Sequence, residues 1–188
     1  NIAREFSVPV FLLSDQAIAT RIEAFNEPDL KNVCQDLSPD LTPVQTHKPY
    51  DLNTETGASN HLVPGTRIED GRYPVVTGLE HDEMGHPSSS PDLHEAMTRK
   101  RRNKLKALSD KLPIPEVYGA QSGEVLVVGW GSTTGPLYEA VEKSGNNGQA
   151  ISALKLRHIN PLPNGLEDIF ARFKKIYVVE MNDGGVHG

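Results

Sequence analysis

From residue 123 onward, short apolar runs alternate with amphipathic segments, and this alternation constrains the fold more than any other feature of the chain. Dense apolar runs at residues 124–130, 150–156 and 175–180 predict three buried strands, and the pattern at 134–144 predicts a helix. A second helix is expected before the last strand. Strands and helices that alternate with short connections favour a parallel sheet. We therefore expect an α/β fold of three layers, a mainly parallel sheet with flanking helices.

Capping residues locate two helix starts. Ser90 and Pro91 begin a helix over 91–112, which Pro113 ends, and Asn164 with Glu167 forms a capping box that starts the helix before the last strand. Apolar residues recur at three- and four-residue steps along the 91–112 helix, so we expect them to share its inward face: Leu93, Met97, Leu105, Leu108 and Leu112.

The sequence of residues 1–90 predicts fewer regular elements. Residues 8–13 indicate a buried strand, and Ser14 is placed to cap a helix over 15–24. Prolines throughout residues 26–90 exclude long helices there, and 73–77 indicates one short strand. The rest of this region is expected to be linker and loop, of the kind that forms interfaces or functional surfaces.

Charge is unevenly distributed. The net charge is −6, yet six of the eight residues at 99–106 are basic and none is acidic, which leaves 13 basic against 25 acidic residues elsewhere. No aromatic residue interleaves with this run, so it lacks the stacking platform of a nucleic-acid site. It indicates a solvated helix face first and a contact to an acidic subunit surface second. We expect all six cations to face outward.

A glycine-rich loop follows the first of the three strands. The sequence Gly-Trp-Gly-Ser-Thr-Thr-Gly at 129–135 could hold a phosphate at a helix start, with Gly131, Ser132, Thr133 and Thr134 as candidate ligand-binding residues. The dinucleotide fingerprint is incomplete, because Thr134 stands at its third glycine and no acidic residue ends the next strand. A tight structural turn is therefore the favoured interpretation, with phosphate binding as the alternative.

Other chemistry-bearing residues give no catalytic set. The acidic and histidine-rich segment 78–87 lacks a helical zinc-ligand spacing, so a polar loop is favoured over a metal site. Cys34 alone can neither form an internal disulfide nor hold an iron–sulfur cluster, and His158 is interpreted as structural. No signal peptide or membrane span is evident, and a cytoplasmic location is expected.

The segment at 78–104 resembles a specific family. TGLEHDEMGHPSSSPDLHEAMTRKRRNKL is similar to the linker and helix of the alpha subunit of 2-oxoacid:ferredoxin oxidoreductases, in the branch assigned to 2-oxoglutarate. PVFLLSDQAIA at 9–19, GEVLVVGWGSTTGPLYEAV at 123–141, INPLP and YVVEMN support the resemblance, which covers most of the chain.

The resemblance implies an architecture and an activity. Residues 1–25 would end a thiamine-pyrimidine-binding domain, 26–122 would be a connecting region, and 123–188 a Rossmann-like α/β domain of the transketolase C-terminal type, truncated at its end. The family decarboxylates a 2-oxoacid oxidatively to acyl-CoA on thiamine diphosphate with magnesium, and electrons pass through iron–sulfur clusters to ferredoxin. The residues that hold these cofactors are expected upstream of Asn1 or in the beta subunit, so the chain is expected to hold none of them.

We accordingly expect an assembly domain of an oxidoreductase, without a catalytic residue or metal ligand of its own. The beta subunit, and ferredoxin through the complex, are the expected partners in an oligomer. A stand-alone module that binds a phosphate-containing ligand at 129–135 remains the alternative, and nucleic acid and membrane are not expected as partners.

Overall fold

The structure is a computed structural model, and it describes residues 1–29, 40–146 and 150–181. The chain divides into two compact units. The first unit comprises Asn1–Val10 and Glu23–Ala107, and the second comprises Phe11–Ile22 and Leu108–Gly188. The domain boundaries expected after residues 25 and 122 stay predictions.

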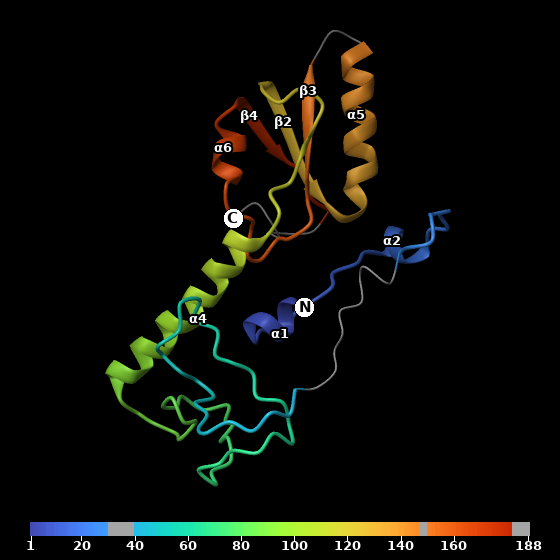
Figure 1. The fold of residues 1–188 in the computed structure, drawn as a ribbon. Coiled ribbons are helices and arrows are strands. Elements are labelled where there is room, and N and C mark those ends of the chain that lie inside the picture. The colour runs from blue at the N-terminus through green and yellow to red at the C-terminus, as the bar shows by residue number, and fades with distance from the viewer. Residues whose placement is uncertain (30–39, 147–149, 182–188) are drawn as a thin grey trace. The chain divides into compact units, whose positions relative to one another are not determined.

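A four-stranded mixed sheet forms the centre of the second unit (Figure 1). The strands are β1 (Val117–Tyr118), β2 (Gly123–Trp130), β3 (Ile151–Leu156) and β4 (Phe173–Val178), in the order β1-β3-β2-β4. β2 pairs in parallel with β3 and β4, which confirms the predicted parallel sheet. The short strand β1 pairs antiparallel with β3 at one edge and was not predicted.

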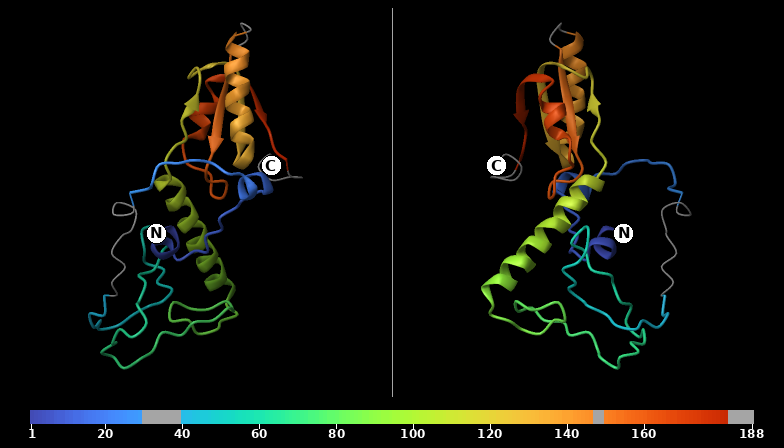
Figure 2. Two further views of the ribbon diagram at one scale, coloured as in Figure 1. Left: turned by 90° about the vertical axis from the view of Figure 1, so that its right-hand side faces the viewer. Right: turned by 60° about the vertical axis from the view of Figure 1, so that its left-hand side comes forward.

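Helices cover both faces of this sheet. α5 (Thr134–Asn146) lies along β3 on one face, and α6 (Leu166–Phe170) lies on the other (Figures 1 and 2). The three-layer α/β arrangement is thus the predicted one. Alternate residues of the strands point to the α6 face. The buried core there is formed by Val117, Leu126, Val128, Leu154, Leu156, Leu166, Ile169 and Phe173.

The predicted capping box at the start of α6 is wrong. Gly165 occupies the N-cap position with a φ of 89°, and no side chain caps the helix. Asn164 instead accepts a hydrogen bond from the Gly165 N–H through Oδ1, at 2.9 Å, and donates one through Nδ2 to Asp110 Oδ1, at 2.8 Å. The asparagine amide is therefore engaged on both sides and unavailable for the reciprocal cap.

The long helix predicted at 91–112 is confirmed as α4 (Pro91–Lys111). Ser90 caps it, since its Oγ accepts a hydrogen bond from the Leu93 N–H at 3.4 Å. Met97 and Leu108 of the expected inward face are buried. Leu105 is 41% exposed, so the expectation that it packs inward is wrong.

The two strands predicted at 8–13 and 73–77 are absent from the structure, which describes both segments. Only the short helices α1 (Ile2–Phe6) and α2 (Gln16–Thr20) form near the first of them, and Leu12 is 96% exposed. An apolar run specifies a strand only where a neighbouring strand takes its backbone hydrogen bonds, and none pairs with these segments. None of the described helices is long and apolar enough to cross a membrane.

Candidate functional site

The predicted ligand loop connects β2 to α5 through a 3-10 turn, η1 (Gly131–Thr133), and it holds a carboxylate from the same unit. Asp15 Oδ2 accepts a hydrogen bond from the Ser132 N–H at 3.0 Å, and its Oδ1 accepts one from the Ile18 N–H at 2.9 Å. Gly131 has a φ of 62°, and a Cβ at this position would lie 3.1 Å from Asp15 Oδ2. Glycine therefore permits both the turn and the close approach of the carboxylate.

The other polar groups of the loop also have internal partners. Thr133 Oγ1 donates to Trp130 O at 2.7 Å, and Thr134 Oγ1 donates to Gly131 O at 2.8 Å. Hydrogen bonding by the Ser132 side chain, and then by the Ile18 N–H, lowers the pKa of Asp15, so its carboxylate is ionised at neutral pH. A phosphate bound at this loop would compete with Asp15, and phosphate binding there stays a prediction.

Gly129 has a packing role at the end of β2. A Cβ there would lie 2.6 Å from Thr133 Oγ1 and 2.7 Å from Leu137 Cδ1. Leu137 is a buried residue of α5. The absence of a side chain at 129 therefore lets α5 pack closely on the sheet, which is a structural reason for this glycine.

The histidine-rich segment at 78–87 is a hydrogen-bonded loop in the first unit. Asp82 Oδ1 accepts from the N–H groups of Met84 and His86, both at 2.9 Å, and the Asp82 N–H donates to His86 O. These bonds from His86 and Met84 lower the pKa of Asp82. Within the described residues no three histidine, cysteine or acidic side chains come close enough to hold a metal ion.

Three of the six clustered cations of α4 have hydrogen-bond partners within the first unit. Lys100 is only 8% exposed, and its Nζ donates to Gly57 O and, at 2.9 Å, to Ser59 Oγ. Burial, first of all, lowers the pKa of this lysine. The expectation that Lys100 faces solvent is wrong, because the oxygens of the 57–59 turn satisfy its ammonium group and make burial tolerable.

Arg101 and Lys104 are engaged as well. Arg101 forms a two-point ion pair with Glu80, with distances of 3.0 and 3.2 Å, and His94 contacts the same carboxylate. Arg101, followed by His94, lowers the pKa of Glu80 to about 2. Lys104 Nζ donates to Ser7 O at 3.0 Å.

Arg101 remains exposed despite its ion pair, as predicted, whereas Lys104 is half-buried. The other three cations, Arg99, Arg102 and Lys106, are also exposed. They recur at steps of three and four residues, so they form one stripe on the outer side of α4. Arg99 makes an ion pair with Glu95 at 3.7 Å, and no ion pair joins Arg102 or Lys106 to another described residue. We call these three residues the basic stripe.

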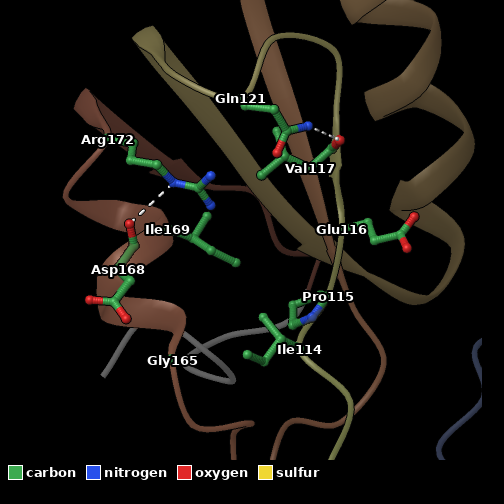
Figure 3. A pocket seen from close by; sticks show the side chains of 9 residues that line it. All are labelled: Ile114, Pro115, Glu116, Val117, Gln121, Gly165, Asp168, Ile169 and Arg172. Carbon is green, nitrogen blue, oxygen red and sulfur yellow. Dashed lines mark hydrogen bonds between the residues drawn. The ribbon is translucent and has the colours of Figure 1, made fainter.

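A pocket that the sequence did not indicate lies in the second unit, between the segment leading into β1 and helix α6 (Figure 3). Its volume is about 690 Å³. Nine residues line it: Ile114, Pro115, Glu116, Val117, Gln121, Gly165, Asp168, Ile169 and Arg172. The two lining segments are separated by more than forty residues, and neither carries a recognisable motif.

The residues present do not fit the cofactors that the resemblance implies. Iron–sulfur clusters are bound by several cysteine thiolates, and the sequence has one cysteine, Cys34, which lies outside the described residues. Magnesium on a diphosphate needs converging oxygen ligands, and the described residues bring no such acidic group together.

Known proteins align with this chain over nearly its whole length. No protein-family model matches the chain. The 2-oxoglutarate oxidoreductase subunit KorA of Mycobacterium tuberculosis is 32% identical over 98% of this chain and 28% of its own length. The 2-oxoglutarate synthase subunit KorA of Methanocaldococcus jannaschii is 27% identical over 100% of this chain and 48% of its own length.

A solved structure agrees with these relatives. The 2-oxoglutarate:ferredoxin oxidoreductase of Magnetococcus marinus, with 2-oxoglutarate, coenzyme A and succinyl-CoA bound, matches with a TM-score of 0.82 and 33% identity, over 98% of this chain and 32% of that chain. The chain thus spans between about a quarter and a half of the proteins it matches. The resemblance drawn from the sequence is confirmed: this chain is homologous, along nearly its whole length, to a part of the alpha subunit of 2-oxoacid:ferredoxin oxidoreductases.

Proposed function

We propose that this chain is a segment of the alpha subunit of a 2-oxoacid:ferredoxin oxidoreductase that acts on 2-oxoglutarate in the cytoplasm. The observation that carries the proposal is the match of 98% of the chain, at 32% and 33% identity, to a 2-oxoglutarate oxidoreductase subunit and to a solved 2-oxoglutarate:ferredoxin oxidoreductase. The intact enzyme would convert 2-oxoglutarate and CoA to an acyl-CoA and carbon dioxide, and pass two electrons to ferredoxin.

Within that enzyme the segment acts in folding and assembly rather than in the chemical step. Thiamine diphosphate, magnesium and the iron–sulfur clusters would be bound by other parts of the alpha and beta subunits. This role is supported by the internal engagement of the polar groups around the glycine loop and by the single cysteine of the sequence. The chain then contributes surfaces on which those subunits pack.

The activity can be tested on the complete alpha subunit that contains this chain, co-purified with its beta subunit. We expect reduction of ferredoxin that requires both 2-oxoglutarate and CoA, and no reduction by the 188-residue chain alone. Reduction of ferredoxin with pyruvate but not with 2-oxoglutarate would refute the substrate assignment. Activity of the isolated chain would refute the assembly role.

The basic stripe is the part of the first unit best suited to contact a partner subunit. Arg102 and Lys106 are exposed and lack ion pairs within the described residues, while the sequence outside 99–106 is strongly acidic. Reversing both charges (Arg102→Glu, Lys106→Glu) should weaken association with the beta subunit about tenfold at low salt, and less at high salt. The matched control is Lys155→Glu with Arg157→Glu, two exposed cations of the second unit whose reversal alters net charge equally. Equal weakening by both pairs would show that only net charge matters.

Phosphate binding at the 129–135 loop is a weaker second proposal. It is supported by the geometry of the Ser132 N–H, which already binds one anionic oxygen, from Asp15. Titration of the chain with inorganic phosphate should shift the Ser132 amide resonance only after Asp15→Ala removes the competing carboxylate. An unchanged Ser132 resonance in that variant would exclude this role.

A further inference from the structure

We propose that the pocket between residues 114–121 and α6 binds a small organic carboxylate with an apolar tail. This inference concerns a site within the second unit and is independent of the proposed oxidoreductase function. The volume of about 690 Å³ lies in the range typical of small-molecule sites, roughly 300–1,000 Å³. It accommodates a ligand larger than a simple ion.

The inner wall of the pocket is apolar and fixed. Val117 and Ile169 are 8% and 4% exposed and belong to the core between the sheet and α6. Ile114 is 57% exposed and adds an apolar side chain at the mouth. Side chains held by core packing cannot collapse into the space, so an apolar group entering it would lose water contact without rearranging the protein.

Gly165 lets the α6 side of the pocket lie close to Ile114. Gly165 has a φ of 89°, and a Cβ there would lie 3.1 Å from Ile114 Cδ1. A side chain at this position would therefore be strained and would press against the opposite wall. The backbone of Gly165 forms the wall instead (Figure 3).

Arg172 supplies the positive charge of the pocket, whose lining also includes Glu116 and Asp168. Its Nε donates to the Asp168 backbone oxygen at 3.2 Å, which orients the guanidinium (Figure 3). No carboxylate among the described residues forms an ion pair with it, so its terminal N–H groups are free to bind a ligand. Figure 3 shows the guanidinium turned toward Ile169, while the carboxylates of Glu116 and Asp168 point away from the centre.

These features select a monocarboxylate over other ligands. The paired N–H groups of one guanidinium match the two oxygens of a carboxylate, and the apolar wall takes the tail. A phosphate dianion would need more positive charge than one arginine supplies beside two acidic residues. Gln121 donates through Nε2 to Val117 O at 3.2 Å, so its oxygen remains an acceptor at the rim.

The test uses 4-phenylbutanoate and its uncharged amide, titrated into the full chain and followed by amide resonances. We expect the acid to bind with a dissociation constant on the order of 1 mM and to shift the resonances of Gln121 and Gly165, with the amide at least fivefold weaker. Equal affinity for acid and amide, shifts confined to other residues, or no shift at about 20 mM would each overturn the proposal.

Variants separate the charge from the apolar wall. Arg172→Gln should weaken the acid about fivefold and leave the amide unchanged, whereas Ile114→Ser should weaken both. Arg157→Gln, an exposed arginine outside the pocket, is the matched control and should change neither. If Arg172→Gln perturbs the fold, Arg172→Lys keeps the positive charge but loses the paired geometry, and it should give an intermediate affinity. Acid binding that is insensitive to both Arg172 variants would also overturn the proposal.

Discussion

Replacing Gly85 by alanine should destabilise the first unit far more than the same replacement at Gly71. Both glycines have a positive φ, 90° at Gly85 and 74° at Gly71, so alanine pays a similar backbone cost of about 1 kcal/mol at each. Their surroundings differ. A Cβ at Gly85 would lie 2.8 Å from the Val75 carbonyl carbon and closer still to its oxygen, whereas a Cβ at Gly71 would have no atom within 4 Å.

The extra cost at Gly85 comes from moving backbone rather than a flexible side chain. Overpacking of this kind costs roughly 1–3 kcal/mol, so Gly85→Ala should cost about 2–4 kcal/mol in total against about 1 kcal/mol for Gly71→Ala. The loop would release part of this strain by opening, which breaks the hydrogen bonds from Asp82 N–H to His86 O and from Ser88 N–H to Glu80 O. The loss should therefore appear locally as well as globally.

Amide hydrogen exchange measures this directly. In Gly85→Ala the Asp82 and Ser88 amides should exchange at least tenfold faster than in Gly71→Ala, because about 1.4 kcal/mol corresponds to a factor of ten. Urea denaturation of the same variants gives the global cost. Indistinguishable exchange in the two variants would refute the reasoning, since it would mean that the close approach to Val75 is absent.

Three further substitutions, with Leu12→Ala as a control for the first, test the second unit. Leu154→Ala truncates a fully buried side chain of β3 and should lower the free energy of unfolding by about 2–5 kcal/mol. Leu12 is 96% exposed, so Leu12→Ala should lower it by less than about 0.5 kcal/mol. Urea denaturation of both variants measures the difference. Gly135→Ala should stabilise α5 by up to about 1 kcal/mol, because a Cβ there meets no atom within 4 Å, and a higher melting temperature would confirm it. The lowered pKa of Asp15 means that its carboxylate stabilises the fold above the unfolded value of 3.8 and that this contribution is lost as pH falls through the folded pKa. In Asp15→Asn the free energy of unfolding, measured by urea denaturation, should therefore fall less between about pH 6 and pH 3 than in the unchanged chain. An equal fall in both chains would contradict the contact between Asp15 and Ser132.

The regular part of the fold was readable from the sequence, because strands and helices in an α/β unit carry complete local signals. The apolar run at 124–130 has the length and β-branched content of a buried strand, and β2 follows it closely. The glycine loop was correctly placed between β2 and α5. The contact of Asp15 with Ser132 was not predictable, because it joins residues more than a hundred positions apart. The prediction that Ser14 caps a helix over 15–24 is wrong, since Asp15 caps the shorter helix α2 instead.

The errors have a common cause, namely that tertiary partners decide what local patterns leave open. Residues 8–13 have strand composition but no partner strand in the structure. Helical spacing alone could not show that Lys100 would find two oxygen acceptors near Gly57 and become buried. The pocket beside α6 depends on the close approach of Gly165 to Ile114, which no periodicity reveals.

The two units should also differ in stability, because apolar burial is unequal between them. Of the fourteen buried hydrophobic residues in the described part of the chain, only Phe6 and Met97 belong to the first unit, and the other twelve belong to the second. The first unit is held instead by polar contacts to α4, such as those of Lys100 and Arg101, and hydrogen bonds contribute less net stability than burial of apolar surface. In the isolated chain, residues 40–90 should therefore exchange their amides, and be cleaved by protease, well before β2 and β3 lose protection. Addition of the partner subunit should restore protection to residues 40–90 if the unit is completed by assembly. Equal protection of both units in the isolated chain would show that the polar contacts suffice, and the assembly argument would fail.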